Sequence, residues 1–149
     1  MKTLGLPILI FLLFPSNSFA QGTKNIPVAV AQFGNDQVGR GMALALQEAI
    51  RGSQNLILVE NNSNRPRMSV FLHSVDTEAH KEIKGRASAI AEVILYHSQE
   101  TPAGGIFITV NVLICGIEQV DNCAIRRLPQ IYQAVDYLRT SWPSLWETL

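Results

Sequence analysis

The chain has 149 residues, of which 47% are hydrophobic, and its 12 basic residues balance its 12 acidic ones. This length suits one domain with its own core. A neutral balance removes any electrostatic case for a nucleic-acid partner or for an anionic membrane surface.

The first 20 residues have the pattern of a signal peptide. Lys2 supplies a short positive end, residues 4–14 are apolar, and Ser18-Phe19-Ala20 fits the small-x-small cleavage rule. The alternative is an uncleaved anchor, but the apolar run is about half the ~20 residues that a membrane span needs. We therefore expect cleavage after Ala20, a periplasmic or secreted location, and a single mature domain over residues 21–149. Its formal net charge is 11 − 12 = −1 once Lys2 is removed.

Residues 26–60 predict a strand–helix–strand unit. The nearly continuous apolar run from Val28 to Phe33 is typical of a strand covered on both faces. Apolar residues then recur at helical spacing from Val38 to Ile50, and Asp36 is suited to cap that helix. The second strand is expected over Leu56–Val59, parallel to the first.

The middle of the chain predicts more sheet. Residues 68–75 are rich in β-formers, whereas the charged segment 77–88 has no period and is expected to be a mobile loop. Residues 89–97 are ambiguous, but Val93-Ile94 disfavours a helix. With the turn signal at 98–105 they predict an antiparallel hairpin with a strand over 106–115. Its alternation predicts one apolar face, made of Ile106, Ile108, Val110, Val112 and Ile114.

The last helix is predicted from an apolar stripe between Ala124 and Trp142, with regular helix beginning near Pro129. The two cysteines, Cys115 and Cys123, are an even number in an exported chain and favour a disulfide. A redox pair is the alternative, but this spacing is far wider than Cys-x-x-Cys. Together the elements predict an α+β (α/β two-layer) domain: a mixed sheet of about five strands with two main helices packed on one face.

The C-terminal tail, residues 142–149, is unusually apolar for a chain end. Trp142, Leu145, Trp146 and Leu149 have helical spacing. One interpretation is a tail folded back onto the sheet, which would bury two large indole rings. The other is an exposed anchor for a partner protein or a membrane surface, and these four residues are then the candidate partner-binding site.

The opening segment resembles a family of small α/β domains in bacterial envelope proteins, which includes the amino-terminal domain of TolB and the curli-secretion lipoproteins. The matching features are VAVAQFGND, a helix beginning near Gly39, and SQNLILVEN. The chain departs from the family in lacking both the acylated Cys of its lipoprotein members and the propeller of TolB. Those absences put membrane anchoring and assembly into the family's complexes in doubt. The resemblance implies a non-enzymatic role in envelope protein contacts, with no catalytic residues to carry over.

No standard catalytic motif is present. Gly34–Gly41 is a glycine-rich strand-to-helix turn without the Lys-[Ser/Thr] of a phosphate loop. Free N–H groups there could still hold an anion or nucleotide, with Asn35, Gly39 and Arg40 as candidates. A capped turn is the plainer interpretation.

Other chemistry has less support. Asp76, Glu78 and His80 alternate, but a metal site needs ligands converging from separate segments, so no metal is predicted. Ser74, His73 and Asp76 are neighbours along one strand, where side chains alternate between faces. Glu92 would have a shifted pKa if buried, although a water-facing Glu on an edge strand is the plainer expectation.

We therefore expect an exported, non-enzymatic accessory protein that needs no cofactor, binds no nucleic acid, and contacts another envelope or secretion-system protein. The tail and the open hairpin edge are its expected contact surfaces. The alternative is a small ligand-binding or hydrolytic domain that uses the Gly34–Gly41 turn.

Overall fold

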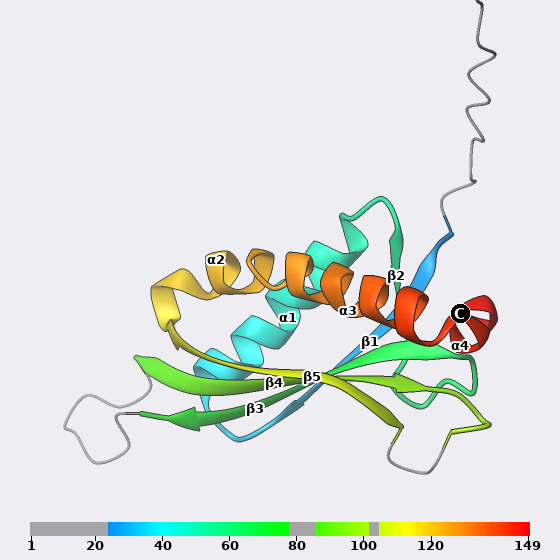
Figure 1. Cartoon of the computed structure of the whole chain (residues 1–149). Helices are drawn as coiled ribbons and strands as arrows, with labels where there is room; N and C mark the ends of the chain where they lie inside the picture. The colour runs from blue at the N-terminus through cyan, green and yellow to red at the C-terminus, as the bar shows by residue number, and fades with distance from the viewer. Residues whose placement is uncertain (1–23, 78–85, 102–104) are drawn as a thin grey trace, which may run out of the picture.

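The computed structural model describes residues 24–77, 86–101 and 105–149, and its strands form one mixed sheet with the helices on one face (Figure 1). The elements are β1 (Ile26–Phe33), α1 (Gln37–Arg51), β2 (Leu56–Leu58), β3 (Arg67–Asp76), β4 (Ala87–His97), β5 (Ile106–Gly116), a 3-10 turn η1 (Ile117–Gln119), α2 (Val120–Ile125), α3 (Leu128–Ser141) and α4 (Pro143–Thr148).

The strand order across the five-stranded sheet is β2-β1-β3-β4-β5. Strand β1 pairs in parallel with both β2 and β3, while β3–β4 and β4–β5 are antiparallel. The predicted mixed sheet, its parallel opening unit and its hairpin are therefore confirmed. The order leaves β2 and β5 as the two edge strands.

Helix α1 forms where its sequence pattern predicts. Asp36 caps it, since its carboxylate accepts a hydrogen bond from the Gly39 N–H, and Gly52 closes its last turn. The helix buries Val38, Met42, Leu46 and Ile50, spaced four residues apart, against the sheet. A stripe with that spacing can face only one way, so it sets how α1 lies on the sheet.

Helix α3 supplies the second half of the core over β5. It begins one residue before Pro129 and ends before the Trp142-Pro143 pair, as predicted. Ile131, Val135 and Leu138 are buried with the α1 stripe in one cluster. The predicted two main helices on one face are confirmed, and two short helices, α2 and α4, accompany them (Figure 1).

The disulfide between Cys115 and Cys123 is confirmed, with Cα atoms 6.2 Å apart. It joins the end of β5 to α2, the short helix that directly precedes α3. The disulfide therefore holds together the two sides of the turn through which the chain passes from the sheet to the helical layer. Cys115 is buried at this turn.

Three details of the strand predictions were wrong. The prediction that β1 is covered on both faces fails only toward the end of the strand: Val28 and Ala29, on opposite faces, are fully buried, but Phe33 is 47% exposed. Strand β4 begins at Ala87, inside the predicted 77–88 loop, and residues 78–85 of that loop lie outside the described residues. A bulge opposite Ile94/Leu95 shifts the alternation of β5, so Phe107 rather than Ile108 shares the face of Val110.

Candidate protein-interaction surfaces

The sheet has one face covered by the helices and one face, named the bare face below, that no described helix or strand covers. The bare face is not exposed throughout, since Ala29 on β1 and Ser69 on β3 lie on it and are fully buried. Strand partners point to the same side, so the register defines the rows of the bare face. Three successive rows across β3, β4 and β5 are Val75–Ala89–Ile114, His73–Ala91–Val112 and Phe71–Val93–Val110. The residues of the bare face are therefore mostly aliphatic or aromatic.

Large apolar side chains on the bare face are strongly exposed. Val112 and Ile114 on β5 are 74% and 73% exposed, and Val75 on β3 is 69% exposed. Phe33 also lies there, stacked on His73 with ring centroids 4.8 Å apart. Scattered exposed apolar residues are normal on a protein surface, but a contiguous set of this kind makes the bare face a candidate interaction surface.

Charge is almost absent from the bare face. Arg67 is the one charged residue among the described positions of the bare face. It lies at a corner of that face, where its guanidinium donates hydrogen bonds to the carbonyl oxygens of Asn61 and Ser63. Beside it, His97 shares a hydrogen bond of 3.0 Å between its Nδ1 and the Ser69 Oγ. Burial, with the nearby Arg67 charge, lowers the pKa of His97, which favours the neutral ring.

The free edge of β5 is the second candidate surface. The Ile117 N–H donates to the Arg86 carbonyl, and hydrogen-bonded pairs alternate along an antiparallel ladder. Val110, Val112 and Ile114 therefore direct their N–H and C=O groups away from β4, toward the open edge. The 11 residues of this strand include no charged residue and no Pro, the usual protections of an exposed edge.

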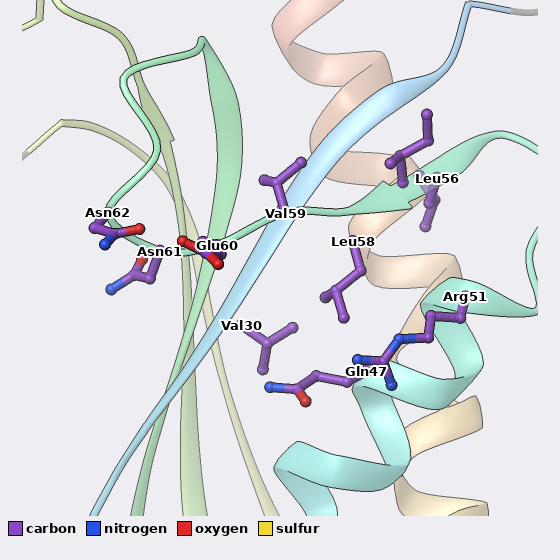
Figure 2. Close-up of a pocket in the computed structure, with 10 residues that line it drawn as sticks. Val30, Gln47, Arg51, Leu56, Leu58, Val59, Glu60, Asn61 and Asn62 are labelled. Atoms are coloured by element: carbon purple, nitrogen blue, oxygen red, sulfur yellow. The ribbon is translucent and has the colours of Figure 1, made fainter.

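An open groove of about 900 Å³ lies at the opposite edge of the sheet (Figure 2). Gln47 and Arg51 reach toward it from α1, and Val30 lines it from β1. The Arg51 guanidinium is paired with Glu48 on the same helix. The groove forms because β2 pairs with β1 only as far as Val28, and the chain then turns away. Its lining brings together no catalytic set among the described residues.

At the Gly34–Gly41 turn, the carboxylate of Asp36 accepts a hydrogen bond from a free backbone N–H group that a bound anion would otherwise use. The Asp36 carboxylate accepts from the Gly39 N–H at 2.7 Å and from the Ser88 hydroxyl at 2.6 Å. Partial burial raises the pKa of Asp36, but the Ser74 and Ser88 hydroxyls and the Gly39 N–H together hold it below its usual range. The Arg40 guanidinium donates to the Asn35 carbonyl at 2.8 Å. Anion binding stays a prediction, and this geometry favours the capped turn.

The C-terminal tail is folded back against the domain. Leu145, Trp146 and Leu149 are half-buried against the core, whereas Trp142 is 43% exposed. The Thr148 and Tyr96 hydroxyls are 2.5 Å apart, which ties α4 to β4. Of the four candidate partner-binding residues, Trp142 is thus the one that the structure leaves exposed to a partner.

The tail also meets the start of the described chain. The Lys24 ammonium donates to the Trp146 carbonyl at 2.8 Å and lies 4.8 Å from the centre of the indole ring. This contact combines a charged hydrogen bond with a cation–π interaction. It holds the two ends of the described domain together.

Glu92 is fully buried on the helix-covered face, contrary to the plainer expectation of a water-facing side chain. β4 is a central strand, so this face lies under the helices. Burial raises the pKa of Glu92, while the Arg127 charge and a 3.2 Å hydrogen bond from Asn111 act in the opposite direction. The second carboxylate oxygen has no hydrogen-bond partner. No catalytic partner or open cavity accompanies it among the described residues.

The remaining sequence candidates do not come together. Glu78 and His80 lie outside the described residues, and no cluster of three potential metal ligands occurs in the part of the chain that the structure describes. Ser74 is buried while His73 points to the bare face, so adjacent positions on β3 place them on opposite sides. No helix among the described segments is both long and apolar enough to cross a membrane.

Comparisons with known proteins identify no relatives by sequence: no family model matches the chain, and no curated protein matches it significantly. The solved structures that match include two that each cover 70% of this chain. A minor lipoprotein from Acinetobacter baumannii has 9% identity, 91% coverage of its own chain and a TM-score of 0.43. A PelC dodecamer from Paraburkholderia phytofirmans has 7% identity, 82% coverage and a TM-score of 0.40. Neither is a TolB or curli-secretion protein, so that resemblance stays a prediction.

Proposed function

We propose that this protein is an exported, non-enzymatic accessory protein of the bacterial cell envelope or secretion apparatus, which acts by binding another envelope protein. The observation that carries the proposal is the open β5 edge, where Val110, Val112 and Ile114 direct their backbone groups outward. An extended segment of a partner can pair with those groups as an added strand. The disulfide fits an oxidising compartment such as the periplasm.

The proposed contact is tested by removing one edge donor. Val112→Pro deletes an outward N–H, and the hydrogen bonds to β4 persist because they use the neighbouring residues. Val112→Ala is the matched control, since it shortens the side chain and keeps the donor. In a pull-down from an envelope extract with tagged protein, we expect Val112→Pro to lower recovery of the partner by about ten-fold or more, as for losing one or two hydrogen bonds. Val112→Ala should retain the partner.

Equal recovery with both variants would remove the β5 edge from the proposal. Trp142→Ala tests the tail separately, because this side chain is exposed and its loss leaves the Tyr96–Thr148 contact in place. Loss of the partner in Trp142→Ala alone would move the contact from β5 to the tail. Thermal unfolding of every variant shows whether the domain is still folded.

A further inference from the structure

We infer that the groove of Figure 2 binds an extended, uncharged peptide segment, which lies beside β1 as an added strand in the position that β2 leaves. The groove is at the opposite edge of the sheet from β5, so it is a second peptide site in addition to the proposed contact. The two sites use different strands, and either can exist without the other.

Strand β1 has an unpaired stretch on the side of β2. The two strands pair over residues 26–28 of β1, and after them the Val59 N–H donates to the Val28 carbonyl. Residues 29–33 of β1 therefore have only β3 as a neighbour among the described strands. These five residues, rising about 3.3 Å each, leave about 16 Å of open edge, which is close to the length of an average strand.

The backbone of Val30 faces this open edge. The backbone groups of successive strand residues point to alternate sides, and the Ile26 N–H and the Val28 carbonyl both bond on the side of β2. The N–H and C=O of Val30 therefore point the same way, and they have no hydrogen-bond partner among the described residues. Val30 lines the groove and is only 9% exposed. Because buried backbone groups are almost always paired, these two need a partner that enters through the groove.

The repeat along the edge identifies that partner as a peptide. A single water molecule could satisfy one isolated group. Gln32, however, follows Val30 by one strand period and directs its own N–H and C=O to the same side, about 6.6 Å further along. That distance is also the repeat of the matching groups on an extended peptide, which pairs with such an edge as an added strand.

The walls of the groove indicate which side chains the peptide carries. Leu58 and Val30 line the groove and point to the helix-covered side of the sheet, so a peptide residue beside Val30 meets apolar contacts (Figure 2). Gln47 on α1 and Asn61 after β2 present amides on the two sides of the groove. Amides can donate to and accept from peptide groups without requiring a charge.

The charges of the groove disfavour a free anion or a nucleotide. The Arg51 guanidinium is already paired with Glu48, and the Glu60 carboxylate belongs to the same lining. The described lining residues include no aromatic ring on which a base could stack. An uncharged extended segment is therefore the occupant that suits both the backbone of β1 and the walls.

The matched variants each place an indole ring on α1. Gln47 lines the groove, so Gln47→Trp fills it, whereas Leu44 is 64% exposed and lines a separate hollow beside α2. Neither residue belongs to the buried stripe of α1, so both variants should fold, which thermal unfolding checks. Gln47→Trp should weaken peptide binding by at least about ten-fold, and Leu44→Trp should leave it unchanged.

The probe is a phage-displayed library of random heptapeptides, selected against the purified protein. Calorimetric titration then measures the affinity of each selected peptide after synthesis. Binding that is lost in Gln47→Trp but kept in Leu44→Trp and in Val112→Pro supports the inference. A selection without binders, or binders that are insensitive to Gln47→Trp, would overturn it. Binders lost only in Val112→Pro would also overturn it, while leaving the proposed contact at β5 standing.

Amide hydrogen exchange tests the open edge before any peptide is added. The Val30 N–H should exchange at least about ten-fold faster than the Ala29 N–H, which lies on the side of β3, and a saturating selected peptide should remove the difference. Equal protection of both amides in the free protein would count against the inference.

N-methylation of the selected peptide tests the added strand itself. Every second N-methyl group should abolish binding, because alternate amides of the peptide pair with β1, and those between should be tolerated. Equal effects at all positions would exclude an added strand.

Discussion

Gly39 on helix α1 lies directly against Ser74 on strand β3. A Cβ added at Gly39 would stand 1.9 Å from the Ser74 Oγ and 2.4 Å from its Cβ. The N-terminal end of the helix can therefore approach the sheet only because residue 39 has no side chain. The same short distance keeps Asp36 in reach of Ser88 on β4, so the cap joins the helix to two strands.

Gly39→Ala should consequently destabilise the protein, although Ala is the better helix former. Pushing α1 away from β3 resembles overpacking a core, which costs about 1–3 kcal/mol. Gly41→Ala is the matched control in the same helix, because its Cβ would meet Val120 at an ordinary 3.4 Å. It should stabilise the protein by about 0.5–1 kcal/mol through helix propensity. Urea unfolding of both variants measures the difference, and equal effects would refute the close approach.

The contrast between these two glycines shows how far the sequence could predict the site. Helical periodicity from Val38 to Ile50 and the Asp36 cap are local signals, and both predicted α1 correctly. The contact of Gly39 with Ser74 joins residues far apart in the chain, and no local pattern indicates it. The glycine-rich turn therefore suggested a ligand, while in the fold it serves close packing of a helix on a sheet.

The same limit applies to β5 and to Glu92. A strict two-residue alternation placed Ile106 and Ile108 with Val110, but the bulge opposite Ile94/Leu95 changes the phase partway along the strand. A bulge depends on pairing with β4, which single-strand periodicity does not contain. Likewise, the polarity of Glu92 suggested exposure, whereas its place on a central strand buries it.

The Cys115–Cys123 disulfide should stabilise the fold by constraining a short loop. Loop-closure entropy for about nine residues gives about 2.5 kcal/mol. The double variant Cys115→Ser/Cys123→Ser should lose about that amount in urea unfolding, and wild-type protein under strong reductant should show the same loss. A variant as stable as the wild type would remove the structural role. Rapid reduction of the bond by a mild reductant would favour the redox alternative.

Glu92→Gln should make stability less dependent on pH. Burial raises the pKa of Glu92 in the folded state above the ordinary 4.5 of the unfolded chain. The stability that its proton contributes is therefore fully present below about pH 4.5 and is lost as the pH rises through the folded-state pKa. Gln stays neutral and can still accept a hydrogen bond from Asn111. The free energy of unfolding of Glu92→Gln, taken relative to that of the wild type, should increase from acid toward neutral pH. A difference that is constant with pH would contradict this assignment.

Trp146→Ala should cost stability rather than only a partner contact. The indole is half-buried, lies 4.8 Å from the Lys24 ammonium, and belongs to the helix whose Thr148 meets Tyr96. Trp146→Ala removes a large side chain of which about half the apolar surface is buried, which should lower the free energy of unfolding by about 1–2 kcal/mol. Trp142→Ala, at a side chain 43% exposed, should cost less.

Chemical denaturation ranks these two variants directly, and Tyr96→Phe supplies a third member of the series. It removes the hydroxyl that meets Thr148 while the ring stays in the core, so a loss of about 1 kcal/mol is expected for one hydrogen bond. If Trp146→Ala and Tyr96→Phe both leave the free energy of unfolding unchanged, α4 is not docked on β4. The four apolar tail residues would then be available to a partner, and deletion of 142–149 could be interpreted as loss of a binding site alone.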